Sequence, residues 1–236
     1  MVAMNVSLTP WRCLPLGCAA LLLQGAAQAG TVDVPLQAGG GYSVPATSLK
    51  EARQRRTIIQ RFDFSCGSAA VATLLTHHYR FPVTEQAVFE AMFNSGDPEK
   101  IKVEGFSLLD MKRFLESHGF QADGFEATLE KLAEAGLPAI ALINEQGYNH
   151  FVVVKGLRDG RVLIGDPASG TRALTQKSFE ALWSNRILFV VSNRQDVALF
   201  NTDADWRAVP RAPLAKGITR DSLAGVVIPK LGPADN

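Results

Sequence analysis

Apolar residues in the first half of the chain recur at the spacing of buried or half-buried helices. The run from Ala69 to Leu75 is apolar enough for a buried helix, and Ser65 is a residue type that caps helix starts. Three more segments carry apolar positions at helical spacing. They cover residues 84–93, 107–118 and 128–135, and the last two are followed by glycine.

The second half of the chain changes to the pattern of β-strands. Three apolar, β-branched segments lie at residues 138–143, 150–155 and 161–165. The sequence Arg158-Asp159-Gly160 between the last two is typical of a tight hairpin turn. A helix at 176–183 and a strand at 187–192 complete the pattern, which predicts an α+β domain over residues 57–192.

The segments that flank this domain show weaker patterns. Residues 30–56 combine a triple glycine with scattered charges, which predicts an extended leader or linker with one short strand. Residues 57–59 are β-branched and predict a short strand that leads into Gln60. Residues 193–236 are mixed and contain prolines, so we interpret them as a C-terminal tail.

Residues 1–29 differ in kind from the rest of the chain. Arg12 is their only charged residue, a short leucine-rich run follows it, and the segment ends with Ala27-Gln28-Ala29. A basic start, an apolar centre and an Ala-x-Ala site are the marks of a cleaved secretory signal. We therefore expect an exported protein whose mature chain begins near Gly30.

Signal removal changes the cysteine and charge balance. Cys13 and Cys18 leave with the signal, so Cys66 has no disulfide partner in the exported part. Of the 24 Lys and Arg residues, all but Arg12 remain, against 23 Asp and Glu residues. This balance favours neither nucleic acid nor an anionic membrane as a partner.

Two interpretations of Cys66 are open at this point. It is either a small buried residue at a helix start or a nucleophile whose thiolate the helix dipole stabilises. A nucleophilic cysteine also needs a base. His77 and His78 lie roughly 16 Å further along the same helix, at about 1.5 Å per residue, which is too far. His118 ends another helix, where interaction with the helix dipole accounts for a histidine.

His150 is the remaining candidate for the base. It begins the strand at 150–155, and Asp166 follows the next strand. If the two strands pair as a hairpin, the start of the first lies beside the end of the second. Asp166 precedes Pro167 and alone would indicate only a turn. Its predicted position beside His150 favours a carboxylate that orients the base.

These residues together resemble the C39 peptidases, papain-like cysteine proteases that remove leader peptides. The resemblance spans about residues 58–191 and is carried by Gln60 six residues before Cys66, by Cys66-Gly67, by the strand from His150 and by Asp166-Pro167. One departure is Ser65, where the family often has aspartate. Both residues cap helices, so the difference is mild.

The resemblance implies a papain-like fold and a role for each matched residue. Cys66 is expected to be the nucleophile, His150 the general base and then acid, and Asp166 the residue that orients it. Gln60 and the Cys66 backbone N–H would form the oxyanion hole. No metal or organic cofactor is required.

The implied function is that of a periplasmic endopeptidase that processes a co-exported polypeptide near small residues such as glycine. Its stand-alone, exported form resembles members of the family linked to functional-amyloid secretion and biofilm assembly, so an amyloid subunit or another component of such a system is an expected partner. Two other functions stay open: a groove that binds and escorts peptides without cutting them, and a cysteine acyltransferase or amidase.

Overall fold

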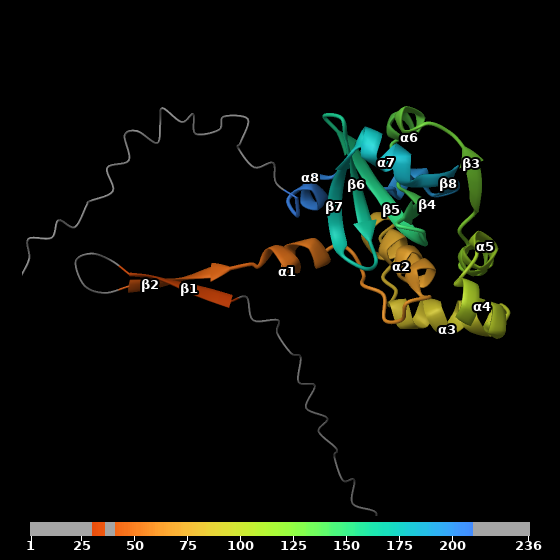
Figure 1. Cartoon of the computed structure of the whole chain (residues 1–236), viewed down its shortest axis with the longest axis horizontal. Coiled ribbons are helices and arrows are strands. Elements are labelled where there is room, and N and C mark those ends of the chain that lie inside the picture. Colours follow the sequence, from red (N-terminus) through yellow and green to blue (C-terminus); the bar gives the residue numbers. More distant parts are fainter. Residues whose placement is uncertain (1–29, 36–40, 210–236) are drawn as a thin grey trace, which may run out of the picture. The chain divides into compact units, whose positions relative to one another are not determined.

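The computed structural model describes residues 30–35 and 41–209, and the predicted signal at 1–29 lies outside them, as do residues 210–236 (Figure 1). The chain divides into two compact units between Ala46 and Thr47. In the first unit, β1 (Gly30–Pro35) pairs antiparallel with β2 (Gly41–Ala46). The sequence predicted one short strand here and the structure has two, because each segment supplies the hydrogen-bonding partner of the other.

The second unit contains the helices that the apolar spacing predicts. Thr84 and Thr128 cap α3 and α6 through their hydroxyls, and Ser107 forms a capping box with Asp110 at the start of α5. The helices are α1 (Leu49–Gln54), α2 (Cys66–His78), α3 (Glu85–Ser95), α4 (Pro98–Glu104), α5 (Leu108–Ser117), α6 (Leu129–Ala135), α7 (Gln176–Leu182) and α8 (Asp203–Trp206), with a 3₁₀ turn η1 at Gln195–Val197.

Helices α1 and α4 were not predicted, although local signals for both are present. Ser48 caps α1. The side chain of Asp97 accepts hydrogen bonds from the first turn of α4, Pro98 occupies that turn, and Gly105 ends the helix with φ of 77°. These are common start and stop residues of helices. Both helices are short and bury little apolar surface, so their apolar periodicity is weak.

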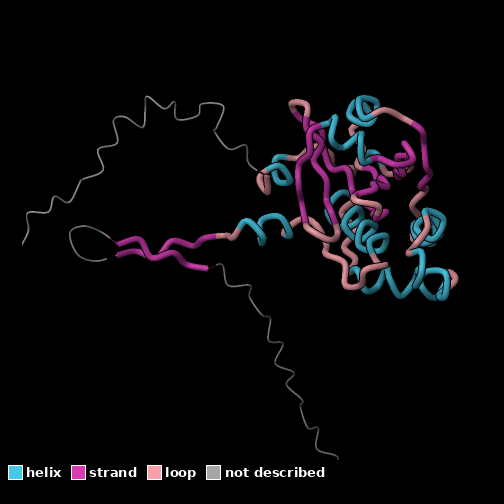
Figure 2. The backbone as a smooth tube through the Cα atoms, viewed as in Figure 1, coloured by secondary structure: helices cyan, strands magenta, loops and turns pink. Residues whose placement is uncertain are grey.

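The second unit also holds one antiparallel sheet, drawn in magenta in Figure 2. Its strand order is β3-β8-β4-β5-β6-β7. Its strands are β3 (Ala122–Glu126), β4 (Ala139–Glu145), β5 (Tyr148–Arg158), β6 (Arg161–Asp166), β7 (Gly170–Thr175) and β8 (Trp183–Val191). The two edge strands, β3 and β7, were not predicted, because their residues are largely polar and their pairing depends on distant partners.

The predicted strand at residues 57–59 is absent. This segment crosses the domain without a ladder partner and is held by side chains instead. The Thr57 hydroxyl lies 2.8 Å from the hydroxyl of Thr171, and the Ile58 backbone N–H donates to Thr73 Oγ1 at 2.9 Å. β-branched residues therefore gave an extended segment here but not a strand.

The hairpin between β5 and β6 was predicted and is present. Asp159 and Gly160 form its turn with φ values of 52° and 70°. Positive φ at both central residues is the geometry that joins twisted antiparallel strands through two residues. The pairing begins at Arg158 with Arg161 and brings the start of β5 close to the end of β6.

Helices cover both faces of the sheet, as Figure 1 shows, and each face has its own apolar core. Helix α2 packs on one face with α3 and α5, while α6 and α7 pack on the other. Residues of α2 are buried on nearly every side, which explains its continuous apolar run. The α+β prediction, with a helical part carrying Cys66 packed on a later antiparallel sheet, is confirmed.

At position 193 the expected tail begins, but the chain continues to pack on the domain as far as the structure describes it. The η1 turn and α8 both lie in this part. The Leu199 backbone N–H donates to the carbonyl of His78, and the side chain of Trp206 is buried.

Leu74 lies fully buried in α2, so Leu74→Ala should lower the free energy of unfolding by about 2–5 kcal/mol through lost burial and the resulting cavity. Leu109→Ala is the matched control, because Leu109 is also helical but 53% exposed; its effect should stay within about 0.5 kcal/mol. Urea unfolding followed by circular dichroism measures both. Equal losses would contradict the described position of α2.

Candidate active site

The β5–β6 hairpin places the His150 imidazole against the Asp166 carboxylate. Nε2 of His150 lies 2.8 Å from Asp166 Oδ1, and the two residues are only 5% and 4% exposed. A carboxylate accepts hydrogen bonds, so Nε2 carries the proton of this contact. Nδ1 then remains as the basic nitrogen of the neutral ring, and it makes no standard hydrogen bond within the described residues.

Asp166 is held on both carboxylate oxygens. The Ala168 backbone N–H donates to Oδ1 at 2.8 Å, and Nε of Arg172 lies 3.0 Å from Oδ2. Burial alone would raise the pKa of Asp166, but the His150 hydrogen bond and charge, the Ala168 amide and the Arg172 charge together lower it to about 2. The group is therefore an anion at neutral pH.

Arg172 is itself oriented by a second carboxylate. Its Nη1 and Nη2 lie 3.3 and 2.7 Å from the two carboxylate oxygens of Glu145, a forked pairing that fixes the guanidinium plane. Glu145 ends β4, and Arg172 lies in β7. Residues of β4 and β7 therefore support His150 on β5 and Asp166 on β6, the two strands between them.

Cys66 is the first residue of α2 and is 6% exposed. Ser65 precedes it at the capping position, but the predicted side-chain cap is absent. The Ser65 hydroxyl instead accepts from the Phe62 backbone N–H and donates to the Phe62 carbonyl, at 3.1 and 3.0 Å. The cap was mispredicted because a tight turn before the helix competes for the hydroxyl.

The Cys66 sulfur and the His150 imidazole interact. Burial alone would lower the pKa of His150, but Asp166 and the Cys66 sulfur raise it to about 9. A protonated imidazole between a carboxylate and a sulfur is the arrangement that stabilises a thiolate. The structure thus brings together three of the four predicted site residues: Cys66, His150 and Asp166.

Gln60, the fourth predicted residue, lies between the other parts of the site. Its backbone N–H donates to the carbonyl of Pro167, directly after Asp166, at 3.0 Å. Its side-chain amide donates to the carbonyls of Phe62 and Asp63, at 3.0 and 3.4 Å. Gln60 therefore organises the loop before Cys66, and its longer hydrogen bond is the weaker of the two.

A cavity of about 350 Å³ adjoins Cys66. Its wall includes Asp63, Phe64, Cys66, Glu104, Gly105 and Tyr148. The Tyr148 hydroxyl donates to the Asp63 carbonyl at 2.6 Å, so its ring links β5 to the loop before Cys66. The end of α4 forms another part of the wall.

The remaining histidines lie where the sequence predicted. His77 and His78 are at the far end of α2, and His78 Nδ1 donates to the Leu199 carbonyl at 2.6 Å. His118 follows the last turn of α5, where its Nδ1 lies 2.9 Å from the Phe114 carbonyl.

In the described ranges, no group of three or more His, Cys, Asp or Glu side chains is placed to hold a metal ion. A search of the same ranges finds no helix that is both long and apolar enough to span a bilayer.

Comparison with known proteins agrees with this geometry. A sequence profile described as the Peptidase C39 family matches residues 55–195. The chain belongs to the C39 peptidase family. Its papain-like architecture is therefore the one that the sequence predicted.

Two similar relatives share most of this chain. One is named "Probable functional amyloid protease FapD", from Pseudomonas aeruginosa, and is 38% identical over 177 residues, which cover 75% of this chain and 78% of that protein. A protein of the same name from Pseudomonas fluorescens is 36% identical over 182 residues, covering 77% and 80%.

One solved structure among those that resemble this C39 chain is titled "Crystal structure of a double glycine motif protease from AMS/PCAT transporter in complex with the leader peptide". It is 26% identical, with a TM-score of 0.48, and the match covers 57% of this chain and 89% of that one.

The sequence analysis missed several residues of the site. Arg172 and Glu145 gave no local signal, because their relation arises only when β4 and β7 take their places in the sheet. Tyr148 lies two residues before His150 and shares its strand face, but the predicted strand began only at His150. The wall at 102–105 belongs to the end of α4, whose Asp-Pro start and glycine end are also signals in the sequence.

His150 should titrate with a pKa of about 9 in the wild type. Its pKa should be lower in Asp166→Asn, because the carboxylate that raises it is removed. NMR of labelled histidine rings measures this. His77 is the internal control, because burial and the Lys155 charge lower its pKa to about 4.

Since the folded-state pKa of His150 exceeds its usual 6.5, its contribution to stability should be complete below pH 6.5 and lost as pH rises through 9. An unchanged His150 titration in the variant would contradict the contact.

Proposed function

We propose that this protein is a periplasmic cysteine endopeptidase that cleaves a co-exported polypeptide. The observation that carries the proposal is the position of His150, whose Nε2 is bonded to Asp166 and whose pKa responds to the Cys66 sulfur. A base between a nucleophile and an orienting group is the arrangement that acyl transfer requires. Family membership supports peptide hydrolysis as the reaction, and the signal-like residues 1–29 support export.

In the first half of the proposed reaction, the Cys66 thiolate attacks the carbonyl carbon of the scissile peptide bond. A tetrahedral adduct forms, with negative charge on the former carbonyl oxygen. The His150 imidazolium then gives its Nδ1 proton to the leaving amine, the C–N bond breaks, and a thioester remains on Cys66. Asp166 holds Nε2–H throughout and stabilises the charged ring.

In the second half, water attacks the thioester. His150 takes a proton from the water at Nδ1, the C–S bond breaks, and the acid product and the Cys66 thiolate are released. The ring ends protonated, as it began. Each half passes through an oxyanion, which needs donors that are in place before the charge forms.

Two donors are proposed for that oxyanion. The first is the backbone N–H of Cys66, which has no acceptor within the helix because Cys66 is the first residue of α2. The second donor is the Gln60 amide, whose hydrogen bond to Asp63 is long at 3.4 Å and can be exchanged for one to the oxyanion. Each such donor is worth about 2.7–4 kcal/mol of the barrier.

The surroundings of Cys66 favour substrates with small residues at the cleavage site. The thiol is only 6% exposed, and the wall beside it includes Gly105 and the Tyr148 ring. Glycine at the scissile bond lets the substrate backbone approach a recessed sulfur without a side-chain clash. This agrees with the preference that the family resemblance implies.

A functional-amyloid polypeptide is the proposed substrate class. Its support is the similarity, over three quarters of the chain, to two proteins named as functional amyloid proteases. An amyloid subunit exported together with the enzyme, or another component of its secretion system, would be the partner, and biofilm assembly would be the process served.

Cys66→Ala should abolish cleavage while leaving the fold intact, because the substitution removes only the nucleophile. Wild type and variant are incubated with the exported polypeptides encoded beside the gene, and intact masses are recorded. Fragments from the wild type alone support the proposal. Fragments from both proteins would overturn it. A wild type that leaves every polypeptide uncut would also overturn it and would indicate a binding module. A wild type that only adds mass to a polypeptide would overturn it in favour of acyl transfer to an amine.

A further inference from the structure

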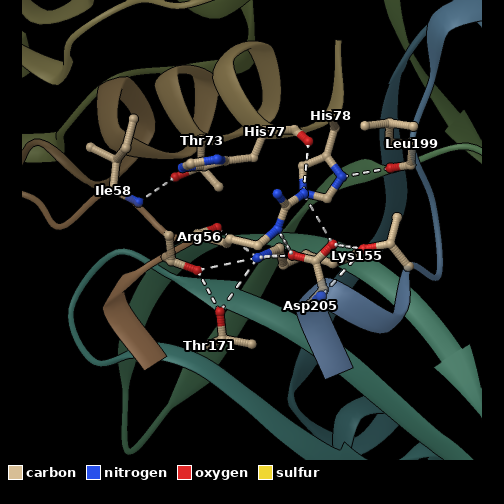
Figure 3. A network of polar contacts seen from close by, with 11 residues as sticks. Arg56, Ile58, Thr73, His77, His78, Lys155, Thr171, Leu199 and Asp205 are labelled. Atoms are coloured by element: carbon tan, nitrogen blue, oxygen red, sulfur yellow. Dashed lines mark hydrogen bonds and ion pairs between the residues drawn. The ribbon is translucent and has the colours of Figure 1, made fainter. Parts of the chain in front are cut away.

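A cluster of charged side chains is buried near the C-terminal end of α2, and the proposed reaction does not use it (Figure 3). Lys155 and Asp205 are both 0% exposed, and Lys155 Nζ lies 2.7 Å from Asp205 Oδ1. Arg56 joins them, with its Nε 3.0 Å from the same carboxylate oxygen. Two cations therefore share one buried anion.

The histidines beside this cluster are uncharged at neutral pH. Burial and the Lys155 charge lower the pKa of His78 to about 3, and the same two causes lower the pKa of His77 to about 4. Burial also lowers the pKa of Lys155, to about 8, although Asp205 opposes this shift. The Lys155–Asp205 pair is therefore predominantly ionised at pH 7.

Lys155 reaches the cluster because of an irregularity in β5. The β5–β6 register pairs Val154 with Ile164 and then Gly156 with Leu163, so Lys155 is an extra residue on its strand. Such a bulge leaves the extra residue out of the ladder and redirects its side chain. Here it points an amine into the interior.

Asp205 is supplied by the segment 195–206, which we call the docked segment. The Asn201 backbone N–H donates to the Lys155 carbonyl at 2.7 Å, and the Trp206 indole donates to Asn201 Oδ1 at 2.7 Å. A Cβ on Gly156 would lie only 2.7 Å from that oxygen, so glycine at 156 permits the docking. The docked segment begins where the family match ends, at residue 195.

The cluster holds the chain that leads to Gln60. Lys155 Nζ donates to the Arg56 carbonyl at 2.6 Å and lies 3.4 Å from the Thr57 hydroxyl. Three residues later, Gln60 is attached to the Pro167 carbonyl. The segment between these two attachments pairs with no strand. The Ile58 backbone N–H within it donates to Thr73 Oγ1 at 2.9 Å, so the cluster fixes the start of the segment, Thr73 its middle and Pro167 its end.

We infer that Lys155 and Asp205 are positioning residues that hold the Gln60 amide at the oxyanion site, and that the docked segment is thereby part of the catalytic apparatus. This inference rests on the proposed function. Asp205 anchors Lys155, Lys155 fixes the Arg56 carbonyl and the Thr57 hydroxyl, and these fix the start of the segment that ends in Gln60.

Stability alone is a weak explanation for this cluster. Desolvation of two buried charges offsets most of their attraction, and apolar side chains of similar volume commonly replace such pairs without loss of stability. What an apolar pair cannot do is donate to the carbonyl of Arg56. The ion pair therefore supplies a fixed donor, Lys155 Nζ, for that carbonyl. This donor fixes the start of the 56–60 segment.

A double-mutant cycle between Asp205→Asn and Gln60→Ala tests the inference in the full chain. The probe is a fluorogenic peptide with glycine at the two positions before an aminocoumarin leaving group; cleavage of the co-encoded polypeptide, followed by mass spectrometry, serves if this peptide is not cut. Gln60→Ala should lower kcat on the order of a hundredfold by loss of one oxyanion donor. Asp205→Asn should lower kcat between about tenfold and a hundredfold by misplacing that donor, with KM unchanged.

The double variant should be no slower than Gln60→Ala alone, because Asp205 acts through the residue already removed. Losses that multiply would overturn the inference, as would an Asp205→Asn variant with unchanged kcat. Rates are expressed per folded molecule, with the folded fraction measured by circular dichroism, so a smaller folded fraction does not imitate a lower kcat. Asp203→Asn is the matched control on α8, because its carboxylate is 86% exposed; its kcat should equal that of the wild type.

Thr57→Val repeats the cycle from the other end of the cluster and decides the matter if Asp205→Asn does not fold. It removes one hydroxyl, which lies 2.8 Å from that of Thr171 and 3.4 Å from Lys155 Nζ. Its effect on kcat should likewise disappear in the Gln60→Ala background, and a persistent effect would overturn the inference. Cleavage that survives Cys66→Ala would instead overturn the proposed function itself.

Discussion

The antiparallel pairing of β5 with β6 is the constraint on which the candidate active site depends. A two-residue turn at Asp159 and Gly160 sets the register, and that register brings His150 at one strand end to Asp166 at the other. A slip of one residue would turn each strand's side chains to the opposite face and separate the two groups. The apolar cores on both sides of the sheet oppose such a slip, so core packing maintains the contact between His150 and Asp166.

Helix α2 supplies the other half of the site. Its apolar residues fill the space above the sheet, which brings its first residue, Cys66, to His150. Electrostatic interactions then set the charges of the residues that packing brings together. Burial disfavours charge on both His150 and Asp166. Their mutual contact compensates, with the Cys66 sulfur adding to it at His150 and the Arg172 charge at Asp166, so both are held in their ionised forms.

The parts of this arrangement that the sequence predicted are those with local signals. The hairpin turn, the strand from His150 and the apolar run of α2 each follow from neighbouring residues. Arg172 and Glu145 lie 27 residues apart and meet only through the completed sheet, so no local pattern identifies them. Asp205 is separated from Lys155 by three strands and a helix, and the extra residue in β5 that makes this contact has no mark in the sequence.

The most direct test of the account is the alkylation rate of Cys66 by iodoacetamide at pH 6, followed at that residue by peptide mapping in wild type and His150→Gln. If the imidazolium stabilises a thiolate, the wild-type cysteine should react at least about tenfold faster than that of the variant. After denaturation the two rates should be the same. Equal rates in the folded proteins would contradict the claim that His150 activates Cys66.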